Sequence, residues 1–316
     1  MTLAMTPVEE SQLFDFLKEC SEKVEDMLES LLPQPDDELE ESRLFEAMRY
    51  SVFAGGKRLR PFLILSTNQL LGGEQTPAIE ERAVRVAAAI EMLHTFSLIH
   101  DDLPCMDNDN LRRGKPTCHV QFDEFTAVLA GDALLSSCFE VLADFQTHPD
   151  ASIRAELVRI AAASTGPLGM MGGQMIDMLA EQREEGERVV EQGELARLQR
   201  KKTGALFQAC CECAALLNHA DKMVQLHLQS YARNVGLAFQ MIDDVLDVTG
   251  TKEQLGKTPG KDAIANKATF ATLLGVDGAR RQAEALCEQA QEQLAHFGPE
   301  AQPLRLLARY IVNRSY

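Results

Sequence analysis

The stretch "AVRVAAAIEMLHTFSLIHDD", residues 83–102, joins an apolar helical pattern to a pair of aspartates. Val86, Ile90 and Leu93 recur every three or four positions, which is the spacing of one face of an α-helix. Pro104 disfavours a helical conformation at the residue before it, so the helix should end or kink directly after the aspartates. The stretch therefore predicts a helix that carries carboxylates at its C-terminal end.

The same helical spacing covers most of the chain, and strand signals are scarce. Thr76 and Pro77 form a typical helix start, with threonine at the N-cap and proline at the first helical position. No repeat of solenoid length and no shift in composition divides the 316 residues. We therefore expect a single all-α domain, residues 1–316, of about ten helices. The other expected helices occupy residues 8–31, 40–54, 61–72, 122–145, 151–165, 193–217, 222–249, 278–296 and 300–313.

The composition excludes several classes of protein. The net charge of −17 argues against general binding to nucleic acid or to anionic membranes. The apolar windows 83–99 and 204–217 are too short and too interrupted to span a membrane, and the N-terminus has no basic targeting region. Of the eight cysteines, Cys210, Cys211 and Cys213 lie inside an apolar helical run, so we expect reduced, packed thiols in a cytoplasmic protein. A disulfide framework or a zinc site is the alternative.

A first acidic cluster begins with the two aspartates that end the quoted helix. Two more carboxylates follow in the expected loop, and a basic pair comes directly after them. A helix C-terminus carries about half a negative charge, so a carboxylate there loses up to about 1 kcal/mol. The cluster is therefore poorly placed for stability unless a cation compensates it. Its members are Asp101, Asp102, Asp107 and Asp109, and the basic residues are Arg112 and Arg113.

A second acidic cluster repeats this arrangement in "FQMIDDVLDVTG", residues 239–250. Asp243 and Asp247 share a helix face at i, i+4 spacing, with Asp244 beside them. Two carboxylates about 4 Å apart near a surface repel by about 4 kcal/mol at an effective dielectric of 20. Hard oxygen ligands without His or Cys suit Mg²⁺, which also prefers to share its shell with phosphates. The alternative for each cluster taken alone is a solvated acidic helix end.

Basic residues are available to match the carboxylates. In "AGGKRLRP", residues 54–61, Pro61 fits the first position of a helix, so two glycines and three cations precede a helix N-terminus. Such a segment predicts an anion site, although a basic surface turn is equally compatible. Further basic sets are Lys201-Lys202-Thr203 and the lysines 252, 257, 261 and 267. Together the two kinds of cluster suggest two diphosphates attached to hydrocarbon groups.

The motifs resemble those of the trans-isoprenyl diphosphate synthases. The resemblance rests on "SLIHDDLPCMDNDNLRRGKPT" (97–117), "FQMIDDVLDVTGT" (239–251), "FAGGKRLRP" (53–61) and "KTGALF" (202–207), in the order of the family and over nearly the whole chain. It implies an all-α bundle around a deep central apolar cavity, a homodimer, and condensation of isopentenyl diphosphate with an allylic diphosphate.

The resemblance also implies roles for individual residues. Three Mg²⁺ ions would be held by the carboxylates Asp101, Asp102, Asp107, Asp243 and Asp247. Isopentenyl diphosphate would contact Gly56, Lys57, Arg60, His94 and Arg113. The allylic diphosphate would contact Arg112, Lys202 and Lys261, with Lys257 and Lys267 on a segment that covers the site. Thr203 and Gln240 would offer oxygens to the carbocation, and Phe239 would line the site.

The product length is expected to depend on residues just before the first cluster. Phe96 lies five residues before Asp101 and Ser97 four before, and Pro104 with Cys105 lengthens the motif to DDxxxxD. An aromatic residue followed by a small one resembles the bacterial-type farnesyl diphosphate synthases, which make a C15 product. Geranylgeranyl diphosphate is the main alternative product, and ordinary helix packing is the alternative role of Phe96.

Two positions depart from the family pattern. Asn110 stands where many relatives have an acid, and the C-terminal "YIVNRSY" has one basic residue, Arg314, where relatives often have several. We therefore expect no closing role for this tail. A terpene cyclase or a non-catalytic partner subunit would share the fold, but each usually lacks one of the motifs present here.

Overall fold

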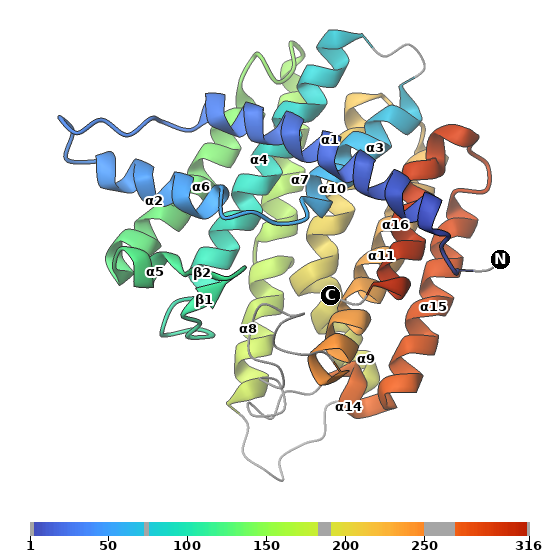
Figure 1. Ribbon diagram of the computed structural model, residues 1–316. Coiled ribbons are helices and arrows are strands. Elements are labelled where there is room, and N and C mark those ends of the chain that lie inside the picture. Colours follow the sequence, from blue (N-terminus) through green and yellow to red (C-terminus); the bar gives the residue numbers. More distant parts are fainter. Residues whose placement is uncertain (1–2, 73–75, 183–190, 250–268, 315–316) are drawn as a thin grey trace. The chain divides into compact units, whose positions relative to one another are not determined.

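The protein is described by a computed structural model that covers residues 3–72, 76–182, 191–249 and 269–314. Its contacts divide the chain into two compact units, each described by itself. The N-terminal unit consists of residues 16–65 and 74–158, and the C-terminal unit of residues 1–15, 66–73 and 159–316. Apart from one short hairpin, the regular elements in the described residues are helices (Figure 1). The expected all-α class is confirmed.

In the N-terminal unit the central helix is α4 (Pro77–Asp101), which packs along α6 (Glu124–Ala143). α2 (Ser42–Val52) also contacts α6, and the short α5 (Cys118–Gln121) precedes it. Between α4 and α5 lies the antiparallel pair β1 (Leu111–Arg112) and β2 (Lys115–Pro116). Three helices contribute residues to both units: α1 (Pro7–Leu31), α3 (Leu59–Leu71) and α7 (Ala151–Thr165).

In the C-terminal unit the central helix is α11 (Lys222–Thr249), which packs against α15 (Val276–Gln293) and α10 (Ala205–Leu217) (Figure 1). The sequence explains this position, because α11 buries a row of apolar residues that includes Leu228, Val235 and Ile242. The remaining elements are α8 (Met170–Glu181), α9 (Gln192–Gln199), the π-helical η1 (Arg200–Gly204), α14 (Phe270–Leu274), the 3₁₀ turn η2 (Pro299–Ala301) and α16 (Gln302–Asn313).

Helix α4 follows the expectation from its sequence. The Thr76 hydroxyl accepts a hydrogen bond from the Ile79 amide at 3.4 Å and so caps the start of the helix. After Asp101 the chain folds back, because the amides of Asp107 and Asp109 donate to the carbonyls of Asp101 (2.9 Å) and Asp102 (3.2 Å). These bonds satisfy carbonyls that a helix end otherwise leaves unpaired.

Several helix boundaries differ from the expectation. α3 begins at Leu59, so Pro61 is its third residue instead of its first. The expected helix 193–217 is divided by the π-helical η1, and the expected helix 122–145 begins only at Glu124. α8 was not expected at all. Its sequence contains adjacent glycines that weaken an isolated helix by about 1 kcal/mol each, so packing must override local propensity.

The packing of α8 explains its glycines. A Cβ on Gly173 would lie 2.3 Å from the Lys202 amide nitrogen and 2.7 Å from its Cα. A Cβ on Gly172 would likewise collide with the Pro167 carbonyl oxygen. Only glycine therefore lets the backbone of α8 come this close to η1.

The cysteines fit the expectation of reduced thiols. All eight are free, and all except Cys105 are buried. Burial raises the pKa of the Cys20 and Cys211 thiols to about 12, so both are packed as neutral groups.

Among the described residues, α6 is the one helix long and apolar enough to cross a membrane by length and composition. Of its most apolar window, 44% is buried within the protein. Core helices of soluble proteins meet the same criterion, so it is weak evidence for a span.

Gly173→Ala is expected to lower the free energy of unfolding by about 1–3 kcal/mol, because its Cβ must displace the backbone of η1. Urea denaturation of the full chain measures this loss. Gly193→Ala in α9 is the matched control, since its Cβ would meet nothing within 4 Å. Equal stability of the two variants would contradict the close contact between α8 and η1.

Candidate functional site

The first acidic cluster surrounds the C-terminus of α4 in the N-terminal unit. Asp102 is buried, and both of its oxygens accept from Arg112, with Nη2–Oδ1 at 2.6 Å and Nε–Oδ2 at 2.8 Å. Burial raises the pKa of the Asp102 carboxyl, although the hydrogen bonds from Arg112 act in the opposite direction. Asp101 and Asp107 are only partly buried. Like Asp109, which is also partly buried, they are more accessible to a dissolved cation than Asp102.

The β1–β2 hairpin places Arg112 on Asp102. Arg112 is paired with Lys115 across the two strands, and the turn between them contains Arg113 (φ 53°) and Gly114 (φ 76°). A turn with both central residues in the left-handed region matches the twist of a tight hairpin. Arg112 was expected to bind a diphosphate. In this structure its partner is Asp102, and its role toward substrate stays a prediction.

The basic loop before α3 receives the side chain of Arg113. Gly55 (φ +93°) and Gly56 (φ +128°) adopt conformations that other residues rarely reach. A Cβ on Gly56 would lie 2.5 Å from Arg113 Cζ, and the Arg113 guanidinium donates to the Gly55 carbonyl. The glycine pair therefore makes room for a guanidinium. Gly56 and Arg113, which the resemblance assigns to the same substrate, lie together.

Arg58 corrects one expectation for this loop. It was counted among three cations of an anion site, but its side chain is fully buried. It donates to Glu91 Oε1 at 2.7 Å and to the Val52 carbonyl at 2.7 Å. The burial of Arg58 is explained by Glu91, a buried carboxylate that needs a counterion. The backbone of Arg58 adopts a left-handed conformation (φ 47°) in this inward position. Arg58 is a structural residue, and Lys57 and Arg60 remain.

Arg60 and His94 lie together, as the resemblance implies. The Arg60 Nη1 is 3.0 Å from His94 Nε2. Desolvation lowers the pKa of His94 well below its usual value, and the positive charges of Arg60, Arg113 and Arg112 lower it further. The imidazole is therefore neutral at pH 7, and its Nε2 accepts the bond from Arg60. His94 helps to orient a cation and does not itself carry a charge.

In the C-terminal unit, η1 presents Lys202 and Thr203. π-Helical turns are rare and occur frequently at functional sites. The Lys202 Nζ is 2.6 Å from Asp177 Oδ2 on α8, and the Thr203 hydroxyl donates to Gln240 Oε1 at 3.2 Å. Lys202 is thus held by α8, and Thr203 and Gln240 hold each other between η1 and α11.

The second acidic cluster lies in the last two turns of α11. Asp244 is buried and accepts from Gln240 Nε2 at 3.1 Å and from the Phe270 amide at 2.8 Å. Asp247 is also buried, whereas the side chain of Asp243 is 39% exposed. Asp244 therefore fixes Gln240 and the start of α14. Asp243 is the most accessible carboxylate of the three.

Arg314 contacts Asp243 of this cluster, a partner that was not expected for the tail. Its Nη2 donates to Asp243 Oδ1 and, at 2.8 Å, to the Phe239 carbonyl. Its guanidinium lies over the Phe239 ring, 4.0 Å from the centroid, and its side chain is 4% exposed. A single planar guanidinium can pair with a carboxylate and stack on a ring, so one basic residue is enough for the contact.

Some functional residues were missed from the sequence, and some expected ones cannot be placed. Asp177 was missed because α8 was not expected; the signal was a lone acid in the apolar run "MMGGQMIDML". Glu91 was treated only as an interruption of an apolar stretch. The predictions for Lys257, Lys261 and Lys267 lie outside the described residues.

The carboxylate oxygens of the site suit magnesium better than a metal ion that is held by protein side chains alone. Within the described residues no group of three His, Cys, Asp or Glu side chains is positioned to hold an ion. Mg²⁺ usually takes only one or two carboxylates and completes its shell with water and substrate phosphates. Asp243 already attracts a cation, since the Arg314 guanidinium contacts it. Asp101, Asp107 and Asp243 are therefore suitable ligands for magnesium bound together with a phosphate.

The lowered pKa of His94 predicts a loss of stability in mild acid. Below about pH 6.5, His94 is protonated in the unfolded chain but stays neutral in the folded protein. Acid therefore favours the unfolded chain, and the free energy of unfolding falls. The contribution is at most about 1.4 kcal/mol per pH unit. Urea denaturation from pH 7 to 5 should give a shallower decline for His94→Gln than for the unchanged protein.

His296→Gln, at an exposed histidine, is the control for this comparison. An identical pH dependence in the unchanged protein and in His94→Gln would show that His94 is not held neutral.

Comparison with known proteins identifies the family. A family model described as polyprenyl synthetase matches residues 41–298. The chain is 46% identical over 302 residues to a dimethylallyltranstransferase of Fischerella ambigua (strain UTEX 1903), covering 96% of this chain and 84% of that protein. It is 42% identical over 303 residues to a geranylgeranyl diphosphate synthase of Cyanophora paradoxa, with 96% and 97% covered.

Two further comparisons agree. The chain is 42% identical over 275 residues to the farnesyl diphosphate synthase of Haemophilus influenzae, covering 86% of this chain and 88% of that protein. The crystal structure of an FPP/GFPP synthase from Zymomonas mobilis superposes with a TM-score of 0.85 at 43% identity, covering 96% of this chain and 99% of that one. With the motifs in place on an all-α fold, the chain belongs to the polyprenyl synthetase family and is an isoprenyl diphosphate synthase.

Proposed function

We propose that this isoprenyl diphosphate synthase makes farnesyl diphosphate, by adding isopentenyl diphosphate to dimethylallyl diphosphate and then to geranyl diphosphate. The chain is similar to farnesyl and to geranylgeranyl diphosphate synthases, so the product length must be argued from its own residues. The observation that carries the C15 product is the fixed position of Phe96 on α4. Geranylgeranyl diphosphate is the second candidate, because the relative from Cyanophora paradoxa carries that name.

Phe96 is held firmly in the N-terminal unit. It is 3% exposed, and the ring of His100 stands edge-on to it with centroids 5.5 Å apart. His100 is held in turn by a hydrogen bond from Nε2 to the Val128 carbonyl at 3.1 Å. Gly131 leaves room for this ring, because a Cβ there would lie 2.3 Å from His100 Nε2. The large side chain of Phe96 therefore cannot move aside easily.

The position of Phe96 relative to the first acidic cluster sets the proposed limit. Five residues of helix separate it from Asp101, which corresponds to about 7.5 Å of rise. A prenyl chain whose diphosphate binds beside Asp101 and which extends back along α4 would meet this ring. Ser97, whose hydroxyl donates to the His94 carbonyl at 2.8 Å, is small and leaves space beside it. We infer that Phe96 ends the space for the growing chain.

The proposed chemistry is electrostatic. Magnesium, when bound, would neutralise the departing diphosphate so that the allylic C1–O bond can ionise. The double bond of isopentenyl diphosphate then attacks C1, and the released diphosphate removes the proton that restores a double bond. Charged side chains hold both diphosphates, and the oxygens of Thr203 and Gln240 face the carbocation. No side-chain nucleophile is required.

We assign the binding residues as follows. Asp101 and Asp107 hold magnesium on one acidic cluster and Asp243 on the other, for a total of three ions, with Asp102 and Asp247 in support. Isopentenyl diphosphate binds to Gly56, Lys57, Arg60, His94 and Arg113. The allylic diphosphate binds to Arg112, Lys202 and Lys261, with Phe239, Lys257 and Lys267 near it.

We further propose a homodimer in the cytoplasm. α6 exposes the apolar side chains of Phe125 (66%), Leu129 (51%) and Val128 (40%) on its surface. A second copy of the chain packed on α6 would cover these residues. This accounts for the apolar character of the helix without a membrane.

The test of the proposed function is incubation with Mg²⁺, isopentenyl diphosphate and either dimethylallyl or geranyl diphosphate, followed by chromatography of the products. Farnesyl diphosphate is expected from both starters, and chelation of Mg²⁺ should stop turnover. Asp101→Ala and Asp243→Ala should each lower kcat by at least about a thousandfold while the circular dichroism spectrum stays unchanged. Near-full activity in either variant would contradict the assigned metal ligands, and a C20 product would favour the geranylgeranyl alternative.

Phe96→Ala is expected to shift the main product from C15 to C20 or longer, because the space beyond the ring opens. Chromatography of the same reaction measures the shift. Phe145→Ala, at a phenylalanine that is 70% exposed, is the matched control and should leave the product length unchanged. An unchanged C15 profile in Phe96→Ala would show that this residue only packs the helix.

A further inference from the structure

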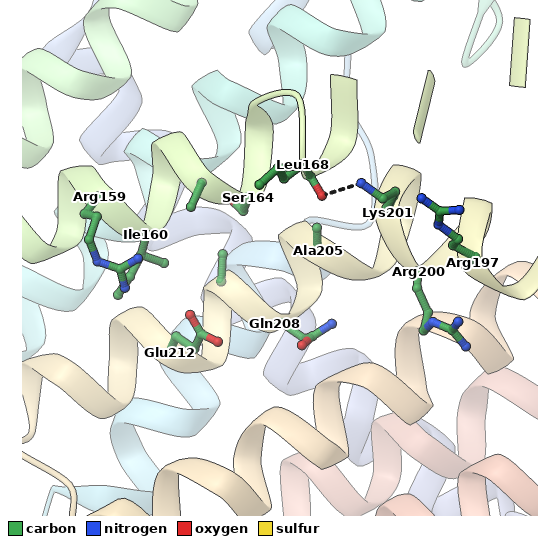
Figure 2. A pocket seen from close by; sticks show the side chains of 12 residues that line it. Arg159, Ile160, Ser164, Leu168, Arg197, Arg200, Lys201, Ala205, Gln208 and Glu212 are labelled. Carbon is green, nitrogen blue, oxygen red and sulfur yellow. Dashed lines mark hydrogen bonds between the residues drawn. The ribbon is translucent and has the colours of Figure 1, made fainter. Parts of the chain in front are cut away.

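A pocket lies in the C-terminal unit, next to the turn that carries Lys202 and Thr203. It has a volume of about 390 Å³ and is formed by α7, α9, η1 and α10. Figure 2 shows Arg197, Arg200 and Lys201 at one end, and Arg159 with Glu212 at the other. Its size falls within the range of small-molecule sites. Among the residues that the structure describes, none of those assigned to substrates or magnesium lines it.

The charge of this pocket is opposite to that of the protein. Four of its lining residues are cationic and one is a carboxylate, in a chain with 31 basic and 48 acidic residues. Arg197 and Arg200 are exposed at the pocket, and Lys201 lies beside them, where its Nζ donates to the Leu168 carbonyl at 2.8 Å. Three cations within one turn and a half of chain repel one another, and a bound anion would relieve this repulsion.

The π-helical turn η1 supplies Arg200 and Lys201 to the pocket's basic end, and α9 supplies Arg197. The turn directs the neighbouring side chains of Lys201 and Lys202 to different partners, because Lys201 bonds to Leu168 whereas Lys202 pairs with Asp177. Lys201 lines the pocket and Lys202 does not. The pocket is therefore separate from the Lys202–Thr203 site but shares one short turn with it.

The rest of the wall is mostly apolar, with Ser164 and Gln208 as its polar members. Small or aliphatic side chains line the space between the two charged ends, and Leu168 is 84% exposed at its edge. These residues leave room for a short hydrocarbon next to the basic end. They are Ile160, Ala163, Leu168, Ala205 and Ala209.

We propose that this pocket binds a diphosphate group, either free or esterified to a short hydrocarbon, at Arg197, Arg200 and Lys201. Arginine guanidinium groups match phosphate oxygens in paired hydrogen bonds, and lysine adds a point charge. The free diphosphate and the ester share this chemistry. The proposal of an ester as ligand rests on the proposed function, because that reaction consumes and forms such molecules. The proposal that the pocket binds a diphosphate group rests on the pocket alone.

Titration calorimetry of the full chain tests the proposal, with sodium diphosphate as the ligand and EDTA present to remove magnesium. The titration is made in the Lys57→Gln/Arg60→Gln background, in which the proposed isopentenyl diphosphate site is weakened. This protein should bind diphosphate, and adding Arg197→Gln/Arg200→Gln should weaken the binding at least about tenfold, since two charge-assisted contacts are lost. Arg281→Gln, at an exposed arginine on α15, is the matched control and should bind normally.

Unchanged affinity in Arg197→Gln/Arg200→Gln, or an equal loss in Arg281→Gln, would overturn the proposal. Prenyl transfer by Arg197→Gln/Arg200→Gln should equal that of the unchanged protein, because neither residue belongs to the reaction site. The titration decides the pocket even if the chain makes no prenyl diphosphate, so the two proposals fail separately. Dimethylallyl diphosphate in place of sodium diphosphate identifies the source: tighter binding supports the ester, and equal binding excludes it.

Discussion

The structure depends on the compensation of carboxylates at helix C-termini. Such carboxylates face the negative end of the helix and one another, so each cluster needs a positive partner. At the end of α4, Arg112 binds Asp102 through both oxygens. At the end of α11, Arg314 binds Asp243 and stacks on Phe239. In each unit an arginine from a later part of the chain thus stabilises an arrangement that the helix alone disfavours.

These arginines also connect stability to the proposed chemistry. A carboxylate that is paired with an arginine can bind a metal ion only if the arginine leaves it and pairs with another anion. A diphosphate is such a partner, since guanidinium groups bind phosphate oxygens as well as carboxylates. The proposed binding of the allylic diphosphate to Arg112, which rests on the family resemblance, would require such an exchange. Asp177, which pairs with Lys202, offers the same exchange on α8.

A buried ion pair differs from these exchangeable ones. Arg58 and Glu91 are both buried, and the Arg58 guanidinium is also bonded to the Val52 carbonyl. Removing one partner of such a pair typically costs about 3–5 kcal/mol, because the other charge is left uncompensated. The pair therefore fixes the loop between α2 and α3. The buried pair thereby fixes the backbone from which the nearby side chains of Lys57 and Arg60 extend.

The sequence by itself determined the helical class, the two acidic clusters, the basic loop and the family. It could do so because helical spacing and charge clustering are local patterns that a chain displays without folding. It also predicted the end of α4 from Pro104, since the steric effect of proline reaches only the preceding residue.

Only the tertiary structure decided which charges face inward and which partner each one has. The sequence "KRLR" does not distinguish Arg58 from its neighbours, because the burial of Arg58 depends on Glu91 in α4. α8 was missed since its glycines oppose an isolated helix, and contact with η1 stabilises it. The role of Arg314 and the pocket beside Lys201 were likewise invisible, because both arise from residues that come together only in the folded chain.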